Sequence, residues 1–172
     1  YPQYQTDITT LAQGISNAGL KMEYILFDDC YMSTVEVAYD LKNVTNHLIA
    51  STCEIMAYGM PYAKIGQYLI GEINYEKICN GFDDFYSNSQ YTFDTTLTGS
   101  LQRLDGYSPV IFFDCGDYVS KLCSNQELLA QFNEQLNRTV PFKRNTDYFY
   151  SMSRGKVKIE TFSGITISDP ST

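Results

Sequence analysis

The chain has 172 residues, which fits one domain, and 44% of them are hydrophobic, enough to bury a core. Its net charge of −8 argues against a nucleic-acid partner, because a phosphate-binding surface needs a basic stripe. No apolar run approaches the roughly 18 residues of a transmembrane helix, and no segment reads as a signal peptide.

The first part of the chain predicts alternating helices and strands. In order, these are a helix over 7–21, a strand over 22–29, a helix over 33–43, a strand over 47–52 and a helix over 60–72. Asp7 or Thr6 would cap the first helix, and Ser33 with Glu36 forms a capping-box pattern before the second. The alternation implies right-handed crossovers and a parallel sheet, and therefore an α/β fold.

The rest of the chain predicts a mixture of helices and short strands. These are a helix over 75–88, strands over 92–101 and 109–115, a long helix over about 116–137, and two short strands within 147–152 and 157–168. No repeat, linker or boundary divides the chain, so residues 1–172 are expected to belong to a single domain.

The stretch ILFDDCYM places two carboxylates and a thiol at the end of the first strand. Ligands of open parallel α/β sheets bind outside the carboxyl ends of the strands. Asp28, Asp29 and Cys30 lie at one such end, and Cys53 with Glu54 lies at the next. From topology alone, Cys30 is either a packed, inert thiol or a nucleophile.

A nucleophilic thiol needs a base or a cation nearby, and the sequence offers one histidine, His47. A helix of about ten residues, roughly 15 Å long, separates it from Cys30, so His47 is expected at the opposite rim of the sheet. A base must come within about 3 Å of its partner. Either Cys30 is not catalytic, or its base comes from a segment outside this chain.

The five cysteines do not indicate a metal or disulfide framework. Their number is odd, no pair has CxxC spacing, and the presence of a single histidine argues against a zinc site. Most of them are expected to be small buried hydrophobes. The acidic residues are dispersed without an EF-hand-like loop, so no cofactor and no metal ligands are predicted.

The stretch from Tyr24 to Tyr62 resembles the clostripain family of cysteine endopeptidases, which share the caspase-like fold. An apolar strand, Asp-x-Cys, a bulky residue and Met, and then VEVAY-L are typical of that family, and GMPY at 59–62 looks like its GWPY turn. Beyond Tyr62 the resemblance is looser but collinear, as far as FSGITIS. The resemblance implies a caspase-like, parallel-sheet α/β/α sandwich.

The resemblance also implies where the missing base lies. In this family the catalytic His is on an earlier strand, and members are cut into a light chain carrying His and a heavy chain carrying Cys. Residues 1–172 would then be the heavy chain, the C-terminal part of one caspase-like peptidase domain, with Tyr1 near the cut. An N-terminal light chain would complete the sheet and cover its edge strand.

The same resemblance implies that Cys30 attacks the peptide bond that follows Arg or Lys in polypeptide substrates, and that its backbone N–H binds the oxyanion. It also implies that acids line the floor of the pocket that takes the Arg or Lys side chain. Asp28 matches one of these acids, and strand alternation would put it on the same face as Cys30. Where relatives often have Asp in GDGWPY this chain has Tyr58, which would weaken or reshape the preference, and Glu54 is a candidate substitute. The alternatives are that Asp28 shapes the turn and that Glu54 is a solvated loop acid.

Two other functions stay open at the level of sequence. One is a non-catalytic caspase-like module that binds peptides or partners, which the absent base and Tyr58 permit. The other is an α/β domain with different thiol chemistry, although no GxGxxG or GKS/T motif is present. Some clostripain relatives bind calcium, and the family is typically exported by bacteria, which implies a secreted, periplasmic or cell-surface protein.

Overall fold

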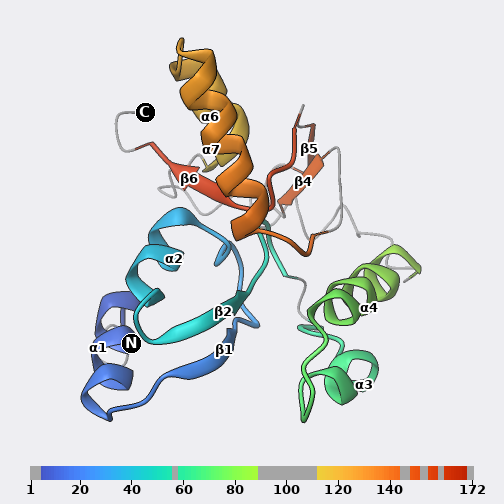
Figure 1. Cartoon of the computed structure of the whole chain (residues 1–172). Helices are drawn as coiled ribbons and strands as arrows, with labels where there is room; N and C mark the ends of the chain where they lie inside the picture. Colours follow the sequence, from blue (N-terminus) through green and yellow to red (C-terminus); the bar gives the residue numbers. More distant parts are fainter. Residues whose placement is uncertain are drawn as a thin grey trace.

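The computed structural model describes residues 5–55, 58–88, 112–143, 148–151, 155–158 and 161–169. Within these ranges the chain forms helices and three two-stranded sheets, one parallel and two antiparallel (Figure 1). Among the residues so described, no helix combines the length and apolar character that a membrane span requires. The expected strand over 92–101 lies outside the described ranges.

The N-terminal part follows the predicted alternation. It consists of α1 (Ile8–Asn17), β1 (Met22–Leu26), α2 (Val35–Leu41) and β2 (Thr45–Ile49). The two strands pair in parallel, with Met22 opposite Thr45 and Leu26 opposite Ile49. Asp7 caps α1, because its carboxylate accepts a hydrogen bond of 2.6 Å from the N–H of Thr10. Both the α/β alternation and the parallel pairing are therefore confirmed.

The prediction that Ser33 caps α2 is wrong. Thr34 is the cap, and its hydroxyl accepts the N–H of Val37 at 3.1 Å. The Ser33 hydroxyl instead donates to the carbonyl of Gly164 at 2.8 Å. The tertiary partner of Ser33 therefore moves the cap by one residue.

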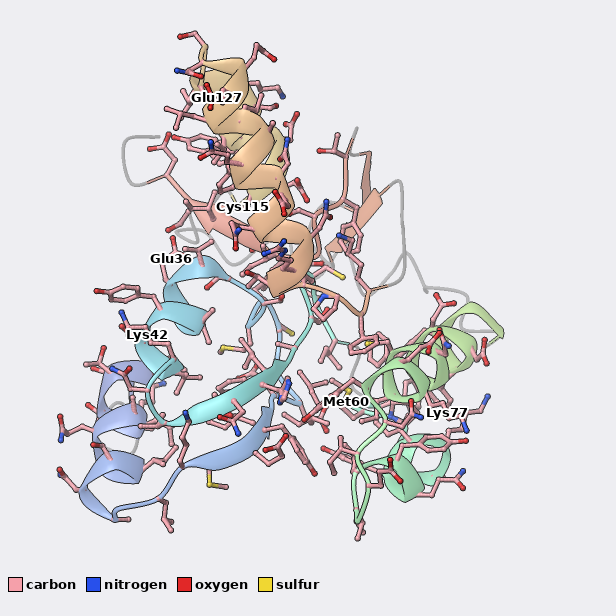
Figure 2. The ribbon with its side chains drawn as sticks, viewed as in Figure 1. Glu36, Lys42, Met60, Lys77, Cys115 and Glu127 are labelled. Atoms are coloured by element: carbon pink, nitrogen blue, oxygen red, sulfur yellow. The ribbon has the colours of Figure 1, made fainter. Side chains whose placement is uncertain are left out.

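The core lies between the β1–β2 pair and a helical layer made of α3 (Tyr62–Ile65), the 3-10 turn η2 (Gly66–Tyr68) and α4 (Tyr75–Asn88). Its buried members are Ile55, Met60, Ile65 and Ile78. Met60 lies between the strands and α4, while α1 and α2 lie on the other side of the strands (Figures 1 and 2). The helix predicted over 60–72 is shorter than expected, whereas α4 has its predicted bounds.

The C-terminal part contains β3 (Phe112–Asp114), α6 (Cys115–Leu122), α7 (Gln126–Thr139), β4 (Tyr148–Ser151), β5 (Gly155–Lys158) and β6 (Thr166–Ser168). Strands β3 and β6 pair antiparallel, as do β4 and β5. The single long helix predicted over 116–137 is wrong, because the backbone of Cys123 is extended and Asn125 starts a new helix. Where the structure describes the tail, it contains three short strands rather than the predicted two.

A short contact joins β6 to the loop that follows β1. The N–H of Thr166 donates to the carbonyl of Ser33 at 2.9 Å, and Thr34 and Thr166 form a parallel bridge. Thr166 is fully buried. The C-terminal part thus packs directly against the segment that carries Cys30.

Candidate active site

Cys30 lies in a loop at the carboxyl end of β1, held against the segment that follows β2. The N–H groups of Tyr31 and Ser33 donate to the carbonyls of Cys53 and Ser51, at 3.2 and 2.9 Å. Because the two strands are parallel, the segments that follow them meet, as the sequence predicted. Strand β1 ends at Leu26, however, so the expectation that alternation puts Asp28 and Cys30 on one face loses its basis.

The Cys30 thiol is half-buried and surrounded by acceptors and acids. Its Sγ donates to the carbonyl of Ile55 at 3.6 Å. Burial raises the pKa of the thiol, the hydrogen bond to Ile55 lowers it, and the nearby carboxylates of Glu54 and Asp29 raise it further. The described surroundings therefore keep the thiol protonated, and a thiolate would need an added base or cation.

Tyr31 was not singled out as a site residue in the sequence, yet its conformation is unusual. Its φ is 59°, the one positive φ at a residue other than glycine in the part of the chain that the structure describes. A left-handed backbone at a bulky residue is strained, and such strain is common next to functional groups. The Tyr31 hydroxyl donates to Glu54 at 2.8 Å, which ties the residue after Cys30 to the loop after β2.

Asp28 binds the loop that contains Tyr58 and Tyr62. Its Oδ1 accepts the N–H of Met60 at 2.8 Å, and its Oδ2 accepts the hydroxyl of Tyr62 at 3.1 Å. This is the turn-shaping arrangement that the sequence left open. A carboxylate has about four acceptor positions, so these two bonds leave room for a further donor.

Asp29 and Tyr58 occupy different positions beside this loop. The Asp29 carboxylate accepts the backbone N–H of Cys30 at 2.7 Å, the group expected to bind an oxyanion. Tyr58 is 62% exposed and directly precedes Gly59, which packs on Asp28. The structure thus places Glu54 and Asp29 near the Cys30 thiol, whereas the Asp28 carboxylate is bonded to Met60 and Tyr62 and Tyr58 lies on the surface.

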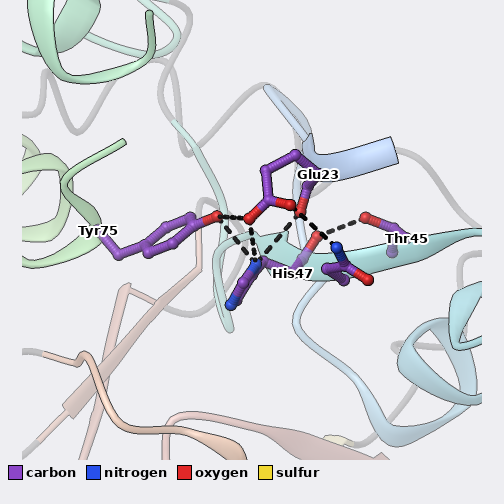
Figure 3. A network of polar contacts seen from close by, with 5 residues as sticks. Glu23, Thr45, His47 and Tyr75 are labelled. Atoms are coloured by element: carbon purple, nitrogen blue, oxygen red, sulfur yellow. Dashed lines mark hydrogen bonds and ion pairs between the residues drawn. The ribbon is translucent and has the colours of Figure 1, made fainter. Parts of the chain in front are cut away.

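His47 is the middle residue of β2 and lies opposite Tyr24, the middle residue of β1. Its Nδ1 is 2.9 Å from the hydroxyl of Tyr75, 3.2 Å from the carbonyl of Glu23 and 3.3 Å from the Glu23 carboxylate (Figure 3). The prediction that His47, the only histidine of the 172 residues, opens its strand at the opposite rim is wrong, because β2 already begins at Thr45. The contacts described for its ring are with Glu23 and Tyr75 and not with Cys30. Among the described residues, no cluster of His, Cys, Asp and Glu could hold a metal ion.

Comparisons with known proteins place this geometry among peptidases. The sequence profile of the clostripain family, Peptidase_C11, matches residues 5–138. No curated protein matches the chain.

Solved structures match almost the whole chain. A clostripain from Bacteroides thetaiotaomicron in complex with the peptide inhibitor BTN-VLTK-AOMK is 67% identical, with a TM-score of 0.84, and the match covers 99% of this chain and 88% of that one. A secreted C11 cysteine protease from the same organism is also 67% identical, with a TM-score of 0.84, but this chain covers 56% of its length. An inactive zymogen C11 protease from Parabacteroides distasonis, 24% identical with a TM-score of 0.75, shares the fold over 95% of this chain and 56% of its own.

Proposed function

This chain belongs to the clostripain family of cysteine peptidases, and we propose that Cys30 is the nucleophile of an endopeptidase that cleaves polypeptides after Arg or Lys. The observation that carries the proposal is the half-buried Cys30 thiol at the carboxyl end of β1, next to carboxylates. Ligand sites of parallel α/β sheets form at this edge.

The proposed reaction has two stages. The sulfur of Cys30 attacks the scissile carbonyl carbon, the C–N bond breaks, and the peptide is held as a thioester while an imidazole transfers the thiol proton to the leaving amine. Water then hydrolyses the thioester and restores the thiol. In this structure the N–H of Cys30 donates to Asp29. In the reaction it would instead donate to the oxyanion, and such a contact is worth on the order of 3 kcal/mol in other hydrolases.

The imidazole is proposed to come from an N-terminal light chain cut from the same precursor. His47 is the only histidine present and is engaged with Glu23 and Tyr75. Among the described strands β1 pairs only with β2, and we propose that its other edge pairs with a strand carrying the catalytic His. With that strand the protein would be a caspase-like α/β/α sandwich, and residues 1–172 would be the C-terminal part of one domain.

The proposed specificity rests on the acids near Cys30. The acceptor positions of Asp28 that no described donor occupies would bind the cationic end of the substrate side chain, with Glu54 as the second acid and Tyr58 on the rim of the pocket. The inhibitor in complex with the 67% identical clostripain carries the peptide VLTK, which ends in lysine. This supports a basic residue before the cleaved bond.

Two further expectations extend this proposal. We propose that the protein is secreted, since the relative from Bacteroides thetaiotaomicron is a secreted protease. The chemistry proposed for Cys30 requires no cofactor. Comparing the thermal stability of the protein with and without a chelator tests whether calcium supports the fold.

The test compares Cys30→Ala with the wild-type protein, assembled with its light chain, on fluorogenic Arg and Lys substrates. Cys30→Ala should lower kcat/KM on the order of 10⁴-fold or more, since it removes the attacking atom. Cys123→Ala, a half-buried thiol between α6 and α7, is the matched control and should leave kcat/KM unchanged. Equal turnover of wild type and Cys30→Ala would refute the assignment, and tight binding of Lys peptides without cleavage would favour the non-catalytic binding module.

A further inference from the structure

One peptide group lies between Asp28 and helix α4. The carbonyl of Gly59 and the N–H of Met60 are the two ends of this planar unit, and in a trans peptide they point in opposite directions. The N–H end donates to Asp28 Oδ1 at 2.8 Å. The carbonyl end accepts the hydroxyl of Tyr86, on α4, at 2.6 Å. The peptide group therefore links Tyr86 on α4 to Asp28 through two hydrogen bonds, one at each end.

The orientation of this peptide group decides what Asp28 faces. Gly59 has φ of +67°, a conformation in which a glycine peptide can rotate at little steric cost. If the plane turned over, the carbonyl oxygen would replace the N–H beside the Asp28 carboxylate, and two acceptors would face each other. The Tyr86 hydroxyl opposes this rotation, because it holds the carbonyl on the side of α4.

Tyr86 is itself held by its neighbours on the helix. Its ring centroid is 4.7 Å from that of Phe82 and 5.0 Å from that of Phe85, the latter in an edge-to-face arrangement. Phe82 in turn packs on the core formed by Ile55, Met60, Ile65 and Ile78. The hydroxyl therefore has a defined position relative to the strand ends.

We propose that Tyr86 is a positioning residue for substrate specificity: through the Gly59–Met60 peptide group it orients the Asp28 carboxylate toward a basic substrate side chain. This inference rests on the proposed function, in which Asp28 recognises that side chain. Tyr86 does not touch the reacting atoms, so its removal should affect the binding of basic substrates more than the chemical step.

The experiment measures KM and kcat of Tyr86→Phe in the assembled protein on Arg and Lys substrates. Loss of the hydroxyl should raise KM on the order of fivefold, the effect of one net hydrogen bond, while kcat stays within about twofold. The backbone N–H of Met60 should also exchange with deuterium faster, because the peptide group that carries it is no longer held by Tyr86. Tyr118→Phe, which removes a hydroxyl bonded to Asp169 at 2.7 Å, is the matched control and should change neither quantity.

A double-mutant cycle with Asp28→Asn separates positioning from general destabilisation. If Tyr86 acts through Asp28, Tyr86→Phe should cause no further rise of KM in the Asp28→Asn background. A fivefold rise in both backgrounds, or a wild-type KM in Tyr86→Phe, overturns the positioning role while leaving the peptidase assignment intact. A wild-type enzyme that cleaves without preference for basic residues refutes the proposed specificity, and the positioning role falls with it.

Discussion

Gly59 is subject to two separate constraints, a left-handed backbone conformation and a close contact with Asp28. A Cβ added at this position would lie 2.8 Å from Oδ2 and 2.9 Å from Oδ1 of Asp28. Gly19, which follows α1, has nearly the same φ of +68°, but a Cβ there would meet no atom within 4 Å. The two glycines thus separate the cost of the conformation from the cost of the contact.

Gly59→Ala should lower the free energy of unfolding more than Gly19→Ala. The left-handed conformation costs about 1–2 kcal/mol at either site, and the clash with the carboxylate adds to it only at Gly59. Denaturant unfolding of both variants measures the difference, and KM for Lys substrates should rise in Gly59→Ala alone. Equal losses of stability would mean that Asp28 moves aside without cost.

At the scale of elements, the break between α6 and α7 shows how a cap overrides a continuous apolar pattern. The pattern predicted one helix with Leu122 and Leu128 on its apolar side, yet these side chains are 69% and 56% exposed. The side chain of Asn125 accepts the N–H groups of Glu127 and Leu128, at 3.0 and 3.1 Å, and so starts α7. Because α6 and α7 have different axes, the side chains that face the rest of the protein differ from those that one continuous helix would turn inward.

Asn125→Ala should destabilise the protein by about 1 kcal/mol, because two N–H groups at the start of α7 lose their acceptor. Asn125→Asp puts a carboxylate oxygen where the amide oxygen of Asn125 accepts these bonds, and should retain the wild-type free energy of unfolding. Urea denaturation of the three proteins provides the measurement. An alanine variant as stable as wild type would show that solvent replaces the cap.

On the scale of the whole molecule, Glu23 connects three elements. Its carboxylate, on β1, accepts the amide of Asn46 at 2.9 Å and the hydroxyl of Tyr75 at 3.2 Å, and it lies beside His47 of β2 (Figure 3). The hydrogen bond from Asn46 lowers the pKa of Glu23, slight burial opposes this, and Tyr75 and His47 lower it further. Tyr75 belongs to α4, so the contact joins the parallel pair to the helical layer.

The lowered pKa of Glu23 fixes the sign of a pH effect on stability. A carboxyl group whose pKa is lower in the folded state stabilises the protein above its unfolded pKa, near 4.5, and this contribution is lost as the pH falls through the folded value. The stability advantage of wild type over Glu23→Gln should therefore shrink below about pH 4.5. Thermal unfolding of both proteins between neutral and acidic pH tests this, and a constant difference would contradict it.

The sequence by itself determined the features that depend on near neighbours. The cap at Asp7, the bounds of α4 and the parallel pairing of β1 with β2 follow from side-chain spacing and from a helix connecting two strands. Parallel pairing in turn brings the segments after the two strands together, so Cys30 and Glu54 could be expected near each other. The motif around Cys30 was enough to indicate the family.

The tertiary structure alone decided which atoms these residues meet. Asp28 is bonded to Met60 and Tyr62, more than thirty positions along the chain, and the cap of α2 shifts to Thr34 because Ser33 binds Gly164. The contact of Tyr86 with the peptide group beside Asp28 left no signal in the local pattern. Spacing records which face of an element is apolar, whereas hydrogen bonds between distant segments depend on how those segments cross in space.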